Sequence, residues 1–235
     1  MPITGLTIIS NPYDYIGQMH NQGLDFVINV IHNAPCAVKE EVIVKLTSQF
    51  VSQFCFSKGT SPLLIESSVV NALNYRRLNV LPPIDNPTQA GFVNDLLTIA
   101  DTYVNPFEHL GVITTQVNDL NQTVFLSSLT EEEKMSVLGA SSVYLNSLYY
   151  WNQIVQTEDN KWATYSSNQS VSLIGLNWGK VGKEDLKGAI GGLAGALIGG
   201  GGALLGAVGG AVGASVAEVV IQIIEKEEEE EGGDE

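Results

Sequence analysis

The segment from Gly188 to Ala217 restricts the possible folds of this chain more than any other part of the sequence. Its thirty residues include no charged side chain, and twelve of them are glycine. Glycine-rich segments that stay disordered are normally polar, so the sustained apolar character predicts an ordered, buried segment. Either a lipid bilayer or a protein core has to surround it.

The glycines of this segment recur every four residues, which places them on one face of a helix. They form two columns, Gly191, Gly195 and Gly199 in the first and Gly202, Gly206 and Gly210 in the second, with Gly209 and Gly213 beside them. Such columns let two helix backbones approach closely, as in the small-residue interfaces of membrane helices. The glycine run 199–202 has a high cost of staying helical. We therefore predict a C-terminal glycine-zipper helical hairpin, with helices over 184–198 and 203–224.

The length of this hairpin leaves its environment open. A spanning helix needs about 20 apolar residues. The second arm reaches this length if Glu218 is tolerated near one end, whereas the first arm is shorter and needs a thinner bilayer. A single tilted span is the other membrane geometry, and Lys180, Lys183 and Lys187 then favour the cytoplasmic side for the residues before Gly188. A soluble protein can instead bury the same glycine faces in its own core or in a homo-oligomer.

The charge of the chain excludes one class of partner. The net charge is −15, and residues 218–235 contain nine acids and one lysine. An acidic chain without a basic patch does not neutralise the phosphates of a nucleic acid, and it gains no attraction to anionic lipids. We therefore expect no nucleic-acid partner, and any affinity for a lipid bilayer has to come from the apolar hairpin.

Repeated helix-start signals indicate that the rest of the chain is all-α. Asn or Ser precedes Pro12, Pro62, Pro87 and Pro106, and the residues 130–133 form a capping box. Apolar residues recur at helical spacing, and we predict helices over 12–32, 38–56, 62–78, 87–104, 106–129 and 131–156. We expect four units, namely a helical bundle over 1–157, a linker over 158–187, the apolar hairpin over 188–224 and an acidic tail over 225–235.

Few residues suggest chemistry. On the first predicted helix, Asp14, Asn21 and Asp25 share a polar stripe, and His20 lies on the stripe beside it. Such a stripe can bind a cation, but it also matches an ordinary solvated helix face with too few hard ligands for a metal site. The sequence contains no serine elbow, phosphate-binding loop or dinucleotide fingerprint. We expect a non-enzymatic protein without catalytic residues, metal or cofactor, and we keep Asp14, His20, Asn21 and Asp25 as a candidate functional stripe.

Aromatic and cysteine residues add weaker expectations. The cluster from Tyr149 to Trp151 fits the core of a soluble bundle, and it also fits the interface of a membrane. Cys36 and Cys55 are too few for a disulfide framework, and we expect them to be small core residues rather than a pair.

Three patches of the chain resemble known proteins. The string NPYDYIGQMHNQGLDF from Asn11, the string SSVYLNSLYYWNQ from Ser141 and the glycine- and alanine-rich C-terminal segment are similar to a group of uncharacterised bacterial proteins common in Bacteroidetes. The resemblance implies a bacterial source and an important first helix, and it implies no activity. In outline, a bundle followed by an apolar hairpin also resembles the pore-forming domains of colicin-type bacteriocins and the glycine-zipper toxins, whose soluble bundle shields a hairpin that later inserts.

These features lead to a hypothesis about function and location. The first residues lack the basic start and the long apolar run of a signal peptide. We expect a protein of the bacterial membrane, or one secreted without a visible signal peptide, whose hairpin inserts into or anchors to a bilayer in a bacteriocin-like or pore-forming role. The alternative is a soluble structural or interaction module, cytoplasmic, with the hairpin buried in its core or in a homo-oligomer.

Overall fold

Helices form all the regular structure in the part of the chain that the computed structural model describes, which is residues 11–55, 66–67, 69–71, 73–74, 81–157, 160–199 and 203–231. The α-helices are α1 (Asp14–Ile31), α2 (Glu40–Cys55), α4 (Pro87–Thr102), α5 (Leu110–Leu126), α6 (Glu131–Gln156), α7 (Lys161–Ser167), α8 (Trp178–Gly199) and α9 (Ala203–Glu231). Two 3₁₀ helices, η1 (Pro106–His109) and η2 (Leu173–Gly175), lie between them. No strand occurs among these residues, so the all-α prediction is confirmed.

The predicted capping residues Asn86 and Thr130 begin α4 and α6 in the structure, whereas α1 begins at Asp14, with Tyr13 rather than Asn11 as its N-cap. The Asn86 side chain accepts hydrogen bonds from the backbone amides of Thr88 and Gln89 at the start of α4. The side chains of Thr130 and Glu133 form the predicted capping box of α6. These side chains satisfy amide groups that the first turn of a helix leaves without partners.

Other features differ from the sequence prediction. The short helix α7 forms within the predicted linker 158–187, because Trp162 and Tyr165 give it a buried face and Asn160 caps its start. α8 begins at Trp178 rather than at 184, and α9 continues to Glu231 rather than ending at 224. Glutamate is a good helix former, so the acidic run extends the helix.

Of the two cysteines, only Cys36 has a side chain in the described part of the structure; the prediction for Cys55 lies outside it. Cys36 is free and exposed, so the expectation that it is a core residue is wrong. Its position between α1 and α2 leaves it at the surface of a connecting segment. Most of the predicted helix 62–78 and the glycines 200–202 lie outside the described residues.

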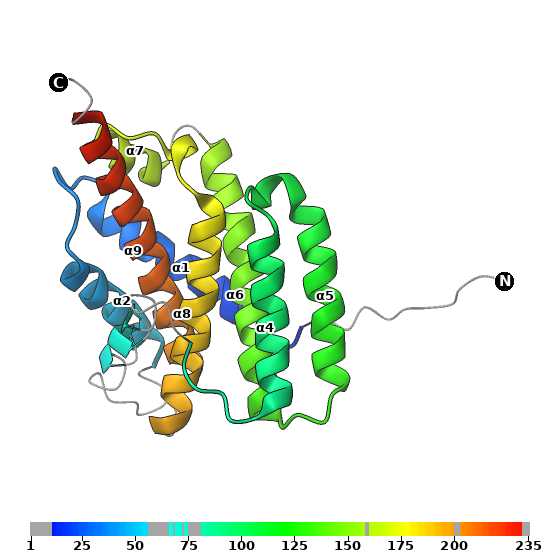
Figure 1. Ribbon diagram of the computed structural model, residues 1–235. Coiled ribbons are helices and arrows are strands. Elements are labelled where there is room, and N and C mark those ends of the chain that lie inside the picture. The colour runs from blue at the N-terminus through cyan, green and yellow to red at the C-terminus, as the bar shows by residue number, and fades with distance from the viewer. Residues whose placement is uncertain are drawn as a thin grey trace.

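α8 and α9 form an antiparallel pair along the middle of the bundle (Figure 1). At one end of the pair Asn177 contacts Gln222 and Lys180 contacts Glu218; further along, Gly188 contacts Gly210 and Gly192 contacts Gly206. Residue numbers therefore decrease along α9 as they increase along α8, which makes the two helices antiparallel. This interface is the most extensive one between described helices.

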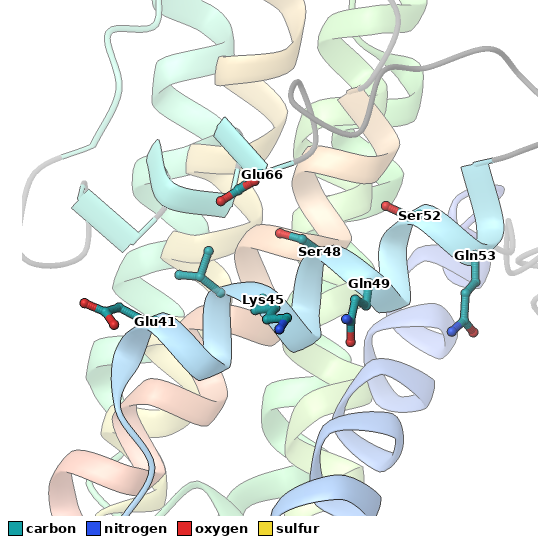
Figure 2. Close-up of a pocket in the computed structure, with 8 residues that line it drawn as sticks. Glu41, Lys45, Ser48, Gln49, Ser52, Gln53 and Glu66 are labelled. Carbon is teal, nitrogen blue, oxygen red and sulfur yellow. The ribbon is translucent and has the colours of Figure 1, made fainter.

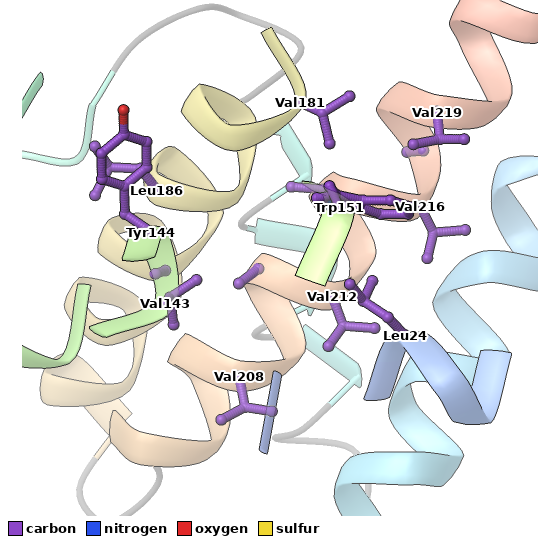
Figure 3. Close-up of a cluster of buried hydrophobic side chains, with 14 of the residues drawn as sticks. Leu24, Val143, Tyr144, Trp151, Val181, Leu186, Val208, Val212, Val216 and Val219 are labelled. Carbon is purple, nitrogen blue, oxygen red and sulfur yellow. The ribbon is translucent and has the colours of Figure 1, made fainter. Parts of the chain in front are cut away.

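The helices α1, α2, α4 and α6 surround this pair, and we call these four helices the jacket. α5 packs outside, against α4 and α6 (Figure 1). Figure 3 shows the core between jacket and pair, where Leu24 of α1 and Trp151 of α6 meet Val212 and Val216 of α9. One described helix, Gly206–Glu229, is long and apolar enough to cross a membrane, and 89 % of its most apolar window is buried in the bundle.

Candidate functional site

The two helices of the α8–α9 pair approach so closely that no Cβ atom fits between them at two positions. A Cβ atom added at Gly188 would lie 2.5 Å from the carbonyl oxygen of Gly210 and 2.8 Å from the Cβ atom of Ala214. One added at Gly192 would overlap the carbonyl group of Gly206. Both overlaps involve a helix backbone, which yields less easily than a flexible side chain. Glycine is therefore required at Gly188 and Gly192.

The predicted glycine columns lie partly in this interface. Gly206 and Gly210 pack against Gly192 and Gly188 of α8, whereas the buried Gly213 faces Val69 and Leu73. Gly191 is buried, Gly195 and Gly199 also lie in α8, and Gly202 lies outside the described residues. Gly188 and Gly192 do not belong to the predicted columns, although they are also four residues apart. The rotation of α8 about its axis decides which column faces α9, and tertiary packing sets that rotation. The role of the predicted columns in a membrane stays a prediction.

Polar side chains link α8 and α9 beyond the glycines. Lys180 Nζ lies 2.9 Å from Glu218 Oε1, and the Glu218 side chain is 2 % exposed. Gln222 donates a hydrogen bond to Glu218 at 2.9 Å, and its Oε1 accepts one from the backbone amide of Asn177 at 2.6 Å. Glu218, the acid within the predicted second arm, is therefore paired inside the α8–α9 pair.

The candidate functional stripe of α1 borders α6. Asp14 Oδ1 accepts a hydrogen bond from Asn146 Nδ2 at 3.1 Å, and Asn21 Nδ2 donates to the backbone carbonyl of Asn146 at 3.1 Å. Asp25 Oδ1 accepts a hydrogen bond from the Tyr150 hydroxyl at 2.9 Å. Residues 11–26 and 141–153 therefore meet along one helix–helix interface.

A glycine also brings α1 close to α6. The backbone amide of Gly17 donates a hydrogen bond to Ser142 Oγ at 3.1 Å, and a Cβ atom added at Gly17 would lie 2.7 Å from the same oxygen. We call this contact between α1 and α6 the α1–α6 seam.

His20 points from this seam into the core, where it meets Asp185. Both side chains are fully buried, and His20 Nε2 lies 3.9 Å from Asp185 Oδ2. The Ser147 hydroxyl donates a hydrogen bond to the same carboxylate oxygen. Ser215 of α9 and Trp151 of α6 lie beside the Asp185 carboxyl. We call His20, Ser147, Trp151, Asp185 and Ser215 the core polar cluster.

Asn21 fixes the position of the proton on the His20 ring. Asn21 donates to Asn146 through Nδ2, so its Oδ1, which can only accept, lies 3.0 Å from His20 Nδ1. His20 Nδ1 therefore carries a proton, and Nε2 of the neutral ring is an acceptor that faces Asp185. Their separation of 3.9 Å is too long for a hydrogen bond.

Four buried polar atoms of the cluster have no hydrogen-bond partner among the described residues. These atoms are His20 Nε2, Asp185 Oδ1, Ser215 Oγ and Trp151 Nε1. Leaving a buried donor or acceptor unsatisfied costs about 1–3 kcal/mol. The atoms come from α1, α6, α8 and α9, so this cost falls where the jacket meets the α8–α9 pair.

Burial makes both titratable groups of the cluster prefer their uncharged forms. It lowers the pKa of His20 from 6.5 to about 4 and raises the pKa of Asp185 from 3.8 to about 7. The Ser147 hydrogen bond opposes the rise in the Asp185 pKa; Ser215 and Trp151 oppose it too, although neither meets hydrogen-bond geometry. Between about pH 4 and pH 7 the cluster holds a neutral imidazole and a carboxylic acid rather than an ion pair.

The tryptophans of the chain form one buried group around the cluster. Trp151 packs against Trp162 and Trp178, each with a ring-centroid distance of 5.0 Å. The sequence contains three tryptophans, and all three are buried. In the aromatic cluster found in the sequence, Trp151 is thus a core residue, whereas Tyr149 is 49 % exposed. Tryptophan emission therefore reports on the docking of α6, α7 and α8.

A surface hollow in the described part of the chain lacks a comparable cluster of polar groups. This hollow of about 730 Å³ lies along α2, and Figure 2 shows Glu41, Lys45, Ser48 and Gln53 spread along that helix rather than converging on one point. Within the described ranges, no group of three or more His, Cys, Asp or Glu side chains is placed to hold a metal ion. No family model, curated protein or solved structure matches the chain.

Proposed function

We propose that this chain is a non-enzymatic, membrane-associated bundle that keeps a glycine-zipper hairpin, formed by α8 and α9, in its core and transfers it to a lipid bilayer. The compact bundle is then the water-soluble form, and the apolar stretch 188–224 is the inserting part. The destination is a bacterial membrane, and the role is bacteriocin-like, pore-forming or anchoring.

The observation that carries this proposal is that the α8–α9 pair has close-packed and polar contacts between its own two helices. Gly188 and Gly192 pack on the backbone of α9, and Lys180 pairs with Glu218. These contacts do not involve the jacket, so they persist if the two helices move together. In hydrocarbon, where water is absent, close glycine packing and internally paired polar groups both favour helix association.

The dimensions of α9 also support insertion. Its apolar part from Gly206 to Ile224, at 1.5 Å per residue, is about 28 Å long. The hydrocarbon core of a bilayer is about 30 Å thick. In the bundle this apolar surface is covered by the jacket, which keeps the protein soluble until the pair is released.

Flotation of the full-length chain with dye-loaded vesicles tests this function. We expect the chain to float with neutral phosphatidylcholine vesicles at least as well as with anionic ones, because its net charge of −15 gives no attraction to acidic lipids. Dye leakage from the same vesicles separates a pore from an anchor. A chain that stays at the bottom of the gradient with both lipids, and elutes as one species in buffer, contradicts membrane transfer.

The second candidate is a soluble structural or interaction module whose α8–α9 pair stays in the core. The deep burial of Gly206–Glu229 favours it, because the central helix of a soluble bundle is buried in the same way. Such a module is cytoplasmic and uses its glycine faces internally or across a homo-oligomer. Light scattering of the full-length chain in buffer, combined with the flotation result, separates the two candidates.

A further inference from the structure

The core polar cluster lies beside the start of the apolar stretch 188–224. Asp185 precedes Gly188 by three residues and lies on α8, whereas Ser147 and Trp151 lie on α6 and His20 on α1. All of these side chains are buried. The surface that separates the jacket from the α8–α9 pair therefore passes through the cluster.

Hydrogen bonding is incomplete where the jacket meets the α8–α9 pair. His20 Nε2 on the jacket side and Asp185 Oδ1 on the opposite side both lack a hydrogen-bond partner among the described residues. The same holds for Trp151 Nε1 on the jacket and Ser215 Oγ on α9. Each of these atoms regains hydrogen bonds with water when the two sides separate, so the cluster favours separation.

The polar group inside the α8–α9 pair provides a contrast. Glu218 Oε1 lies 2.9 Å from Lys180 Nζ and accepts a hydrogen bond from Gln222 Nε2, also at 2.9 Å, within the pair. Separation from the jacket does not break these bonds. This polar group is therefore satisfied inside the pair, whereas, within the described part of the chain, four atoms of the core polar cluster lack partners where the pair meets the jacket.

We propose that the core polar cluster is a built-in weak point that lets the α8–α9 pair separate from α1 and α6. Its biological use rests on the proposed function, but the weak point itself is a property of the soluble protein. Burial, and to a smaller degree the charge of Glu184, disfavour the ionised form of Asp185 inside the bundle and therefore act in the same direction. An uncharged amide at this position would not carry that penalty.

Hydrogen exchange of the full-length protein in buffer at pH 7 tests this proposal. In the Asp185→Asn variant we expect opening of α8 and α9 to be at least about tenfold rarer than in the wild type, because the amide keeps the shape of the carboxyl without its ionisation. Ser147→Ala should make opening about tenfold more frequent, because it removes the donor that the carboxylate has. Asp101→Asn is the matched control, since the exposed Asp101 also links the jacket to α8, through Lys183.

Two kinds of result would contradict the proposal that the core polar cluster is a weak point. One is an Asp185→Asn variant that opens as often as the wild type or fails to fold; another is a control variant that changes opening as much as Asp185→Asn does. Flotation of the wild type judges the proposed function separately. If Asp185→Asn opens tenfold less often but the wild type does not float, the weak point stands and membrane transfer fails.

Discussion

Removing the members of the buried His20–Asp185 pair one at a time should reveal two opposite pH dependences of stability that compensate in the wild-type protein. Between about pH 4 and pH 6.5 the folded pair holds one proton, on Asp185, and the unfolded pair also holds one, on His20. The stability of the folded state depends on pH only where the two states bind different numbers of protons. The wild-type pair therefore contributes almost no slope in this range.

In the Asp185→Asn variant only the His20 term remains. The pKa of His20 is lowered on folding, from 6.5 to about 4, so this term is fully present above pH 6.5 and is lost as the pH falls towards 4. At 1.36 kcal/mol per pH unit, the free energy of unfolding rises by about 3 kcal/mol between pH 4 and pH 6.5. Relative to the wild type, the variant gains about 4 kcal/mol by pH 7, because the raised pKa of Asp185 no longer penalises folding.

In the His20→Gln variant only the Asp185 term remains. The pKa of Asp185 is raised on folding, from 3.8 to about 7, so stability is highest near pH 4 and falls as the pH rises to 7. The expected fall is about 4 kcal/mol. Any packing loss shifts the whole curve and leaves its slope unchanged.

Urea unfolding followed by tryptophan emission, from pH 4 to pH 8, measures these slopes as differences from the wild type. The exposed Asp101→Asn change is the control, and it should alter stability by less than about 1 kcal/mol at every pH. If His20 and Asp185 formed an ion pair instead, Asp185→Asn would destabilise the protein by about 3–5 kcal/mol at pH 6. That result, or two variants with the wild-type slope, would refute the neutral pair.

Two further substitutions test the packing. Gly192→Ala should destabilise the protein by about 1–3 kcal/mol in urea unfolding, because the new methyl group overlaps the Gly206 carbonyl. Gly91→Ala on α4 is the control: a Cβ atom there has no other atom within 4 Å, so this change should stabilise the protein by about 0.5–1 kcal/mol. Equal effects of the two substitutions would contradict the close approach of α8 and α9. Tyr150→Phe removes the hydroxyl that donates to Asp25 and accepts from Trp162 Nε1, and it should cost about 1–3 kcal/mol, read as a lower Tm. An unchanged Tm would show that this hydroxyl does not help to hold α1 and α7 against α6.

Local signals in the sequence were enough to predict most helices. Asn86 and Thr130 cap their helices through hydrogen bonds that span only two or three residues, so a short string of sequence contains the whole interaction. The exposed Cys36 and the short helix α7 were mispredicted because burial there depends on distant partners. Tyr165, for example, accepts a hydrogen bond from the backbone amide of Val38, far away in the sequence.

The candidate site was only partly predictable for the same reason. His20 belongs to the stripe found in the sequence, but Asp185 lies on another helix and no local pattern connects them. The glycine spacing predicted close helix packing, yet it could not select Gly188 and Gly192 as the residues that face α9. Apolar composition also cannot separate a bilayer from a protein core, because both environments require the same side chains.

The central claim is that the α8–α9 pair leaves the bundle to enter a bilayer, and a disulfide between α1 and α9 tests it most directly. Gly23→Cys with Val212→Cys suits this purpose, because a Cβ atom added at Gly23 lies 2.5 Å from Val212 Cγ2 and disulfides join Cβ atoms roughly 4 Å apart. The same Cβ atom lies 2.9 Å from Phe50 Cε1, so the Phe50 ring has to shift slightly. Cys36 and Cys55 are replaced by serine in the same full-length chain. We predict that the reduced protein floats with neutral vesicles and the oxidised protein does not. Equal flotation of both forms would contradict release of the pair, and flotation of neither would place α8 and α9 permanently in the core.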